Sequence, residues 1–256
     1  MSTSINTNVS KYGNIRRLNH ADTKKAAPTL LASFKNDALA ELLVVHIKSQ
    51  EERDRVELAL YEAYLNQHMT KGYCFGINET PSGFETVAVW SHPDSIDMGL
   101  ESFAHLMESG YDKVWAILGK EGREKVFYGM LPLLHDSCVR ILSNDSRFKH
   151  KNLFTLVYLG SLPSAQGKGN VRKMFSYVFD KYVDVTENSI CYLESSSPSN
   201  IPIYNRFGFY FYEDIMLGEN FDGAQEGKDF AMMNVMIRGN KGADWRQEAN
   251  NLGGKL

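Results

Sequence analysis

Two closely spaced glycines carry the clearest chemical signal in this chain. Gly167 and Gly169 lie between an apolar run, 153–159, and a segment with helical periodicity, 171–183. Glycine allows a sharp turn and a close approach of the backbone to a ligand. A helix that begins here directs its unpaired N–H groups and the positive end of its dipole toward the turn. The stretch 163–171 therefore predicts a phosphate-binding site, and the simpler alternative is a plain connection from strand to helix.

Two common nucleotide-binding motifs do not fit these residues. In a Walker loop a Lys is followed by Ser or Thr, whereas Lys168 is followed by Gly169. A Rossmann turn places a third glycine three residues after the second, where this chain has Arg172. Neither nucleotide motif is therefore expected.

The stretch Gln166–Val171 resembles the acyl-CoA site of the GNAT family of N-acetyltransferases. The signature of that family is Gln or Arg, two residues, Gly, one residue, then Gly or Ala. Val171 departs from it, and its branched side chain would crowd a pyrophosphate if it pointed into the turn, although its backbone N–H is retained. The resemblance extends to Pro163 before the turn and to the later sequence Tyr204-Asn-Arg-Phe-Gly208-Phe209, and the stretch 193–204 looks most like fungal members.

This resemblance implies a fold. The family has an α+β architecture, an α/β/α sandwich around a mixed, mostly antiparallel sheet of about six to seven strands. A splay between the fourth and fifth strands and a helical insertion before the fourth are also implied. With 256 residues, 43% of them hydrophobic, the chain suits one core. We expect a single domain over 13–239, with flexible segments at 1–12 and 240–256.

The resemblance also implies acetyl-CoA as the cofactor. Gly160 and Ser161, at the end of the fourth strand, are the expected backbone donors to the thioester carbonyl, because fixed dipoles that face a developing charge contribute strongly to catalysis. Asn200 is expected to contact the CoA arm or, alternatively, to cap a helix. The predicted cofactor-binding residues are Gly160, Ser161, Leu162, Gln166, Gly167, Lys168, Gly169, Asn170, Val171, Asn200 and Tyr204.

Two residues are candidates for proton transfer. Tyr204 matches the family's tyrosine near the cofactor sulfur, and a phenol with a pKa of about 10 can protonate a departing thiolate; the alternative is that its ring only packs. Glu194, at the end of the fifth strand, is the candidate general base, because partial burial raises a carboxyl pKa. A helix cap or an ion pair with a Lys is the alternative for Glu194. His135 and His150 are weaker candidates.

Composition argues against several other classes. The net charge of −3 and the pI of about 6.2 disfavour a general binder of nucleic acid or of anionic membranes. Cys74, Cys138 and Cys191 form no CxxC pair, so neither a disulfide framework nor a metal site is expected. No stretch approaches the roughly 18 apolar residues of a membrane span. A cytoplasmic location, or a nuclear one, is expected.

Periodicity predicts the elements that position these residues. They are a strand from Ile15, helices over 22–34, 37–46 and 51–68, a hairpin of 72–77 and 84–90 around a turn at 78–83, helices between 93 and 150, and final strands within 209–216 and 229–237. The helices between 93 and 150 either cover one sheet face or line the acceptor pocket.

The predicted reaction is transfer of an acetyl group from acetyl-CoA to a primary amine, by direct attack of the amine on the thioester. Because no acidic run marks a docking site for a basic protein tail, a small-molecule amine is the expected acceptor, with protein N-termini as the alternative. A monomer or homodimer is expected. The competing hypotheses are an acyl-CoA-binding sensor or interaction module with little turnover, and a structural domain that binds no CoA.

Overall fold

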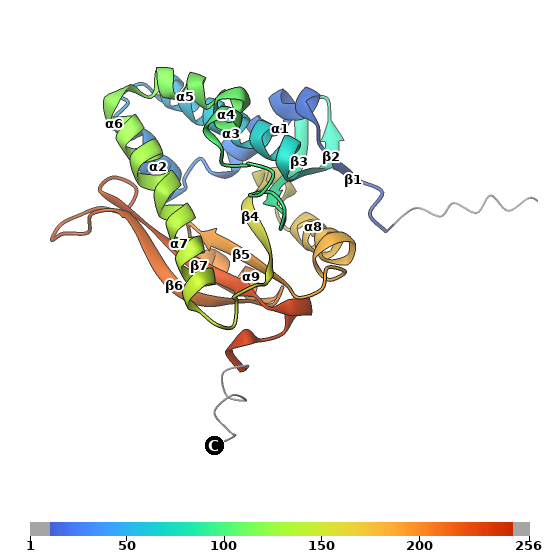
Figure 1. The fold of residues 1–256 in the computed structure, drawn as a ribbon. Coiled ribbons are helices and arrows are strands. Elements are labelled where there is room, and N and C mark those ends of the chain that lie inside the picture. Colours follow the sequence, from blue (N-terminus) through green and yellow to red (C-terminus); the bar gives the residue numbers. More distant parts are fainter. Residues whose placement is uncertain (1–10, 248–256) are drawn as a thin grey trace, which may run out of the picture.

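A seven-stranded mixed sheet organises the molecule, whose computed structural model describes residues 11–247 (Figure 1). The strand order is β1-β2-β3-β4-β5-β7-β6, and all neighbours are antiparallel except β4 and β5. The strands are β1 Ile15–Arg17, β2 Tyr73–Thr80, β3 Gly83–Ser91, β4 Asn152–Ser161, β5 Ser189–Ser195, β6 Phe209–Gly218 and β7 Phe230–Arg238. The predicted mixed, mostly antiparallel sheet is confirmed.

The sheet opens between β4 and β5. Their parallel pairing ends at Leu156 and Leu193. On the other edge of β4, Val89 pairs with Tyr158 and Trp90 with Leu156, so that Val157 is an extra residue on β4. Such a bulge bends the strand and increases its twist. The second half of β4 therefore diverges from β5, as the predicted splay requires.

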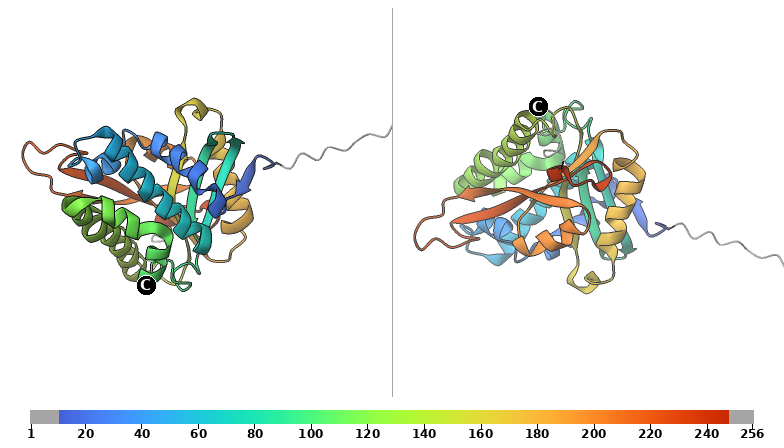
Figure 2. Two further views of the ribbon diagram at one scale, coloured as in Figure 1. Left: turned by 90° about the horizontal axis from the view of Figure 1, so that it is seen from above. Right: turned by 90° about the horizontal axis from the view of Figure 1, so that it is seen from below.

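Helices form the layers on either side of the sheet (Figures 1 and 2). They are α1 Thr23–Ser33, α2 Ala38–Val44, α3 Gln50–Lys71, α4 Phe103–Leu106, α5 Asp112–Ile117, α6 Gly119–Arg123, α7 Leu131–Asn144, α8 Asn170–Val178 and α9 Ile201–Asn205. The predicted helical insertion is α4 to α7, between β3 and β4. Local signals fix several ends: Asp37 caps α2, and the Ser49 hydroxyl accepts a hydrogen bond from the Glu52 N–H at the start of α3.

Alternation along the strands assigns side chains to the two layers, because successive side chains face opposite sides of a sheet. On β3, Val87 packs with α1 and α3, whereas Ala88 packs with α8. On β5, Cys191 packs on the α8 side, whereas Tyr192 packs with residues of α2, α3 and α7. Glu194 follows Tyr192 by two residues and so shares its face.

Two details differ from the sequence-based expectation. Strands β2 and β3 stay paired as far as Thr80 and Gly83, so the hairpin turn is shorter than 78–83. Beyond β7, Trp245 is 5% exposed and its indole Nε1 donates to the carbonyl of Ile237 at 2.8 Å. Trp245 is therefore part of the core cluster, and the domain extends past the expected boundary at 239. Of the segments expected to be flexible, 1–12 and 240–256, residues 1–10 and 248–256 lie outside the described residues.

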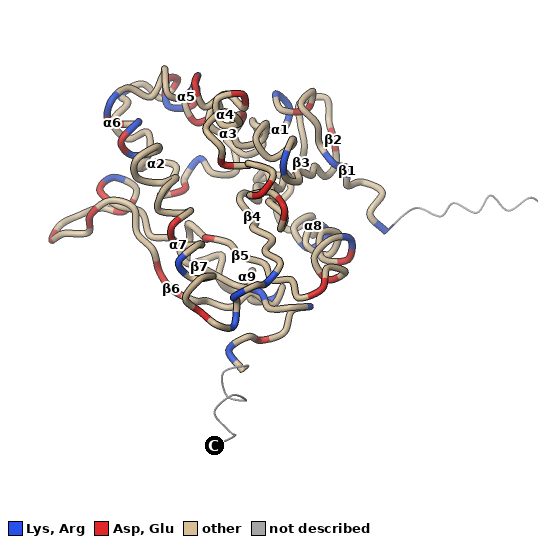
Figure 3. Tube along the Cα trace, viewed as in Figure 1, with Lys and Arg blue, Asp and Glu red and all other residues tan. Residues whose placement is uncertain are grey.

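Charges do not single out one outer face. Figure 3 shows Lys, Arg, Asp and Glu distributed over most of the elements. None of the helices within residues 11–247 has the length and apolar character needed to cross a membrane.

Candidate active site

The predicted phosphate loop connects β4 to α8. Gly167 and Gly169 have φ values of +76° and +79°, a region that side chains other than glycine's rarely adopt. A Cβ atom at either position would meet no atom within 4 Å, so both glycines face open space. Gly169 is the N-cap residue of α8, and no side chain caps this helix. The first N–H groups of α8 therefore remain available, and the loop fits a pyrophosphate.

A carboxylate on β3 ties this loop to the sheet. Glu85 accepts hydrogen bonds from Asn78 Nδ2 at 2.7 Å, Lys168 Nζ at 2.9 Å and Asn170 Nδ2 at 2.9 Å. These bonds, in that order of importance, lower the pKa of Glu85 to about 2. The side chains of Lys168 and Asn170 are thus occupied, so both residues would contribute to a cofactor site chiefly through their backbone.

Val171, the residue that departs from the family motif, packs inward. Its partly buried side chain lies against the apolar cluster that contains Met174 and Phe175 of α8 and Trp90 of β3. The core therefore accommodates the branched side chain, while the Val171 N–H stays in the uncapped first turn of the helix.

The backbone donors predicted on β4 fall into two groups. The Leu162 N–H donates to the carbonyl of Glu85 at 2.9 Å. Bonded and non-bonded pairs alternate in an antiparallel ladder, so the Gly160 N–H is also directed to β3. The N–H groups of Leu159 and Ser161 then point away from β3, toward the splay. Of the two predicted donors, Ser161 directs its N–H toward the splay and Gly160 does not, and the alternation adds Leu159. Leu162 is predicted only to bind the cofactor, and its N–H is bonded to β3.

Gly160 has a packing reason for its residue type. A Cβ there would lie 2.9 Å from Ser33 Oγ and 3.0 Å from Leu30 Cδ2, both on α1. The absent side chain thus allows α1 to approach β4. Ser161 is anchored on the same strand, since its hydroxyl shares a 2.7 Å hydrogen bond with that of Thr86.

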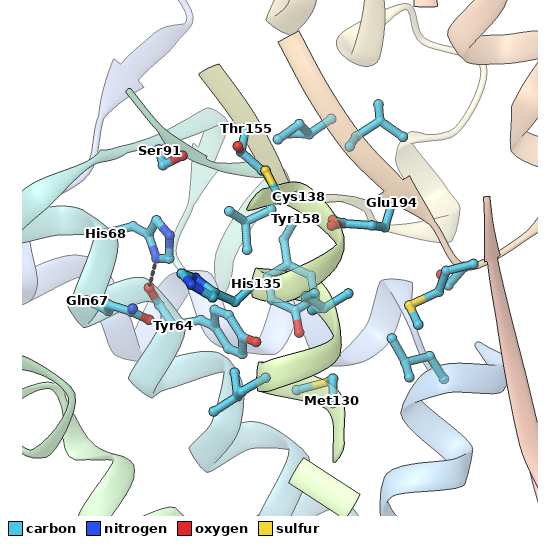
Figure 4. Close-up of a pocket in the computed structure, with 18 of the residues that line it drawn as sticks. Tyr64, Gln67, His68, Ser91, Met130, His135, Cys138, Thr155, Tyr158 and Glu194 are labelled. Carbon is cyan, nitrogen blue, oxygen red and sulfur yellow. Dashed lines mark hydrogen bonds between the residues drawn. The ribbon is translucent and has the colours of Figure 1, made fainter. Parts of the chain in front are cut away.

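A cavity of about 680 Å³ lies beside the splay. Its walls come from α2, α3, α7 and the facing parts of β4 and β5 (Figure 4). The structure brings Glu194, Asn200 and Tyr204 together on this lining, although they come from β5, a short 3-10 turn and α9. The loop residues 166–171 do not line it. Leu159 does, so β4 runs between the two parts of the site.

Glu194 has the properties expected of a general base. Burial raises its pKa to about 7. Figure 4 shows Glu194, Tyr158 and Cys138 converging on the cavity from β5, β4 and α7. Within residues 11–247, Glu194 forms no ion pair and caps no helix, so the two alternative roles find no support there. A carboxyl that titrates near neutral pH can accept a proton from an amine.

The ring of Tyr204 packs against other aromatic rings, and the residue also lines the cavity. Its ring meets Phe175 and Phe209 edge-on, with ring centroids 6.2 and 6.0 Å apart. Burial, together with the charge of Asp37, raises the pKa of Tyr204 to about 12. The phenol therefore stays protonated at neutral pH and remains a proton donor.

The remaining predicted residues, Asn200, His135 and His150, differ in whether they line the cavity. Asn200 makes no side-chain cap bond to α9, which removes the support for its alternative role. His135 lines the cavity, where its Nδ1 lies 2.6 Å from Glu101 Oε2. His150 does not line it, and its carbonyl accepts a hydrogen bond from Asn188.

Sequence reasoning missed the acidic character of the cavity. Its lining contains five carboxylates and, among the described residues, neither Lys nor Arg. The five are Asp37, Glu57, Glu101, Asp136 and Glu194. They belong to five separate stretches of the chain, so no run of acidic residues in the sequence indicates an acidic site. The one available signal is local: Glu57 and Tyr61 lie one turn apart on the same face of α3.

Solved structures with a similar fold are acetyltransferases. An acetyltransferase from Corynebacterium glutamicum, related to histone acetyltransferase HPA2, is 18% identical, with a TM-score of 0.55 and coverage of 88% of this chain and 94% of the other. A Drosophila melanogaster polyamine N-acetyltransferase, which forms N-acetylagmatine, is 13% identical, with a TM-score of 0.54 and coverage of 88% and 98%. Arylalkylamine N-acetyltransferase 2 from Aedes aegypti is 12% identical, with a TM-score of 0.51 and coverage of 88% and 99%. These similarities show the fold.

One protein with a similar sequence also bears the name of an N-acetyltransferase. An uncharacterized N-acetyltransferase of Schizosaccharomyces pombe is 28% identical over 202 residues, which cover 79% of this chain and 76% of that protein. No family model matches the chain. The fold is the one that the resemblance of Gln166–Val171 to the GNAT family predicted, and the name of this relative is consistent with that family.

Proposed function

We propose that this protein is an acetyl-CoA-dependent N-acetyltransferase whose acceptor is a small, cationic amine. The acidic cavity beside the splay carries the proposal. Its volume of about 680 Å³ lies within the usual range for small-molecule sites. Among the described residues the lining has five carboxylates and neither Lys nor Arg, which favours a cationic ligand over an anionic one. The amine substrates named for the Drosophila and Aedes enzymes are consistent with this acceptor class.

The chain's own residues can perform each proton transfer. Acetyl-CoA, when bound, supplies an acetyl group activated as a thioester. The N–H groups of the loop and of the first turn of α8 would hold its pyrophosphate. The N–H groups of Leu159 and Ser161 face the splay and can stabilise negative charge there. Glu194 would take the proton from the amine, and Tyr204 would donate a proton to the departing CoA thiolate.

A screen for acetyl-CoA consumption tests this function. Polyamines, simple alkylamines, amino acids, aminoglycosides and peptides serve as acceptors, and we expect turnover with small cationic amines. Calorimetry with CoA and acetyl-CoA separates the alternatives. Binding without turnover of any acceptor would favour a sensor, and absence of binding would reject the enzyme and the sensor together.

A further inference from the structure

The five carboxylates of the cavity are not equivalent. Asp136 is exposed, and Glu101 is paired with His135. The carboxylate of Asp37 accepts two backbone N–H groups of α2, at 3.0 and 3.1 Å, and the hydroxyl of Ser196. These three acids are therefore either solvated or already provided with partners. Two carboxylates remain outside these arrangements: Glu194, the candidate base, whose neighbour is the Tyr192 hydroxyl, and one other.

The other is Glu57 on α3. Burial raises the pKa of Glu57 to about 7, and the charges of Asp54 and Glu41 contribute. Arg53 lies nearby, but its guanidinium donates to Glu41 and to two backbone carbonyls. Among the described residues Glu57 has no ion pair. A partly buried carboxylate without a paired cation is unfavourable, so a cation brought by a ligand would stabilise it.

A buried hydroxyl accompanies this carboxylate. Tyr61 is 3% exposed and lines the same cavity. Burial, together with the charges of Glu57 and Asp37, raises the pKa of Tyr61. Its hydroxyl makes no hydrogen bond to any residue within 11–247. The rings of Phe34 and Tyr158 lie 6.1 and 5.4 Å from that of Tyr61. A carboxylate, an unpaired hydroxyl and electron-rich rings together suit an ammonium group.

The carboxyl of Glu57 lies apart from that of Glu194, although the charge of Asp37 acts on both Glu57 and Tyr204. Glu57 is on α3, whereas Glu194 is on β5 at the splay. The carboxylates that act on Glu57 belong to α2, to α3 and to the cap of α2, and none of them acts on Glu194. Most of the remaining lining is apolar. One cavity therefore contains two separate carboxylates, Glu57 and Glu194, within a mostly apolar lining.

We propose that Glu57 and Tyr61 bind a second cationic group of the acceptor, so that the enzyme selects amines with two positive charges separated by an apolar spacer. This inference rests on the proposed function, and it assigns Glu57 to specificity and Glu194 to catalysis. The acceptor would place one amine at Glu194 and the other at Glu57.

A matched series of acceptors tests the assignment. Linear α,ω-diamines with four to eight carbons, whose nitrogens lie about 6 to 11 Å apart when extended, are compared with n-alkylamines of equal length. For the wild-type protein we expect a lower KM with the diamines. Glu57→Gln should raise the KM for diamines by at least about tenfold, because hydrogen bonds to charged groups are strong, with little change in kcat. The same variant should leave the monoamines within about twofold.

Two further variants serve as controls. Glu51→Gln changes an exposed carboxylate on the same helix outside the cavity lining and should alter neither acceptor class. Tyr61→Phe removes only the hydroxyl, and should shift the diamine KM in the same direction as Glu57→Gln by a smaller factor. Thermal melting of each variant verifies folding.

The outcomes separate this inference from the function itself. Equal effects of Glu57→Gln on diamines and monoamines, or no effect on either, would overturn the role of Glu57. If no amine is turned over at all, the proposed function fails, and calorimetric titration with the same diamines and monoamines still decides about Glu57. Diamine binding that weakens in Glu57→Gln supports the subsite, and wild-type binding that does not favour the diamine rejects it.

Discussion

Glu85 and Glu194 are the same residue type in two regions of the molecule, and their surroundings shift their pKa values in opposite directions. Beside the phosphate loop, hydrogen bonds from Asn78, Lys168 and Asn170 lower the pKa of Glu85 to about 2. Beside the splay, burial raises the pKa of Glu194 to about 7. The first carboxylate therefore keeps a constant charge that holds a loop, whereas the second changes its charge in the pH range where an amine must lose a proton.

The same contrast applies to the two halves of the site. The loop offers uncapped N–H groups at the start of a helix, which suit an anion. Within residues 11–247 the cavity is lined by carboxylates and by neither Lys nor Arg, which suits a cation. Because β4 lies between them, a cofactor with anionic phosphates and an acceptor with positive charge can approach one point from different sides. Each prediction below would break or sharpen this contrast.

The largest effect is expected for Glu194→Gln. If this carboxylate removes the proton from the amine, its loss should lower kcat by about 10² to 10⁴. Acetyl-CoA affinity, measured by calorimetry, should stay within a few-fold. An unchanged kcat in a folded variant, with chemistry rate-limiting, would reject Glu194 as the base.

The pH dependence tests the same contrast directly. A base works only when deprotonated, so with a pKa of about 7 wild-type kcat should rise through neutral pH and fall on the acid side. This acid limb should disappear in Glu194→Gln. Glu85→Gln should leave the limb in place, because the pKa of Glu85, at about 2, lies far below the measured range. A limb that moves in Glu85→Gln would contradict the separation of the two regions.

Tyr204→Phe should have the next largest effect. The substitution keeps the ring contacts to Phe175 and Phe209 but removes the proton that the phenol could donate. Turnover should fall by roughly 10², while acetyl-CoA affinity stays within a few-fold. A parallel loss of affinity would make the role of Tyr204 structural, and unimpaired turnover would reject it as the acid.

Gly169→Glu tests the phosphate loop and should weaken acetyl-CoA binding by at least about tenfold, or 1.4 kcal/mol. The new side chain would fill the open side of the loop and repel phosphate. Gly119→Glu is the matched control, because Gly119 also has a positive φ, +67°, and open space at its Cβ position, but lies in the helical insertion. The control should share the backbone strain and leave affinity unchanged. Equal affinity in both variants would reject the loop as the phosphate site.

The difference between the two regions also explains what the sequence could predict. The loop is formed by consecutive residues, Gln166–Val171, so its glycine spacing and the following helix can be recognised directly. The cavity is formed by residues from Phe34 to Met233, and its acidity exists only after folding. Glu57 is one charged residue among many on α3, and its spacing from Tyr61 is the one local signal that distinguishes it.

The backbone donors on β4 show a second limit of prediction from sequence. The sequence indicates the end of β4 but not which N–H groups face the splay. That choice depends on register, and Leu162 bonding to Glu85 fixes it in favour of Leu159 and Ser161 over Gly160. Gly160 is a glycine because Ser33 packs against it, a reason that lies on a helix more than a hundred residues earlier.

The smallest effect is expected for Val171→Gly, which asks whether the one departure from the motif belongs to the loop or to the core. If the side chain crowded the phosphates, its removal would tighten CoA binding. Because it packs against the cluster of Met174 and Phe175, we expect affinity for CoA to be unchanged or slightly weaker. Stability should fall by about 1 to 2 kcal/mol, since the variant loses buried apolar area and adds the cost of glycine in a helix. Calorimetry and denaturant unfolding check the two effects separately. Tighter binding in this variant would place Val171 on the ligand side of the loop.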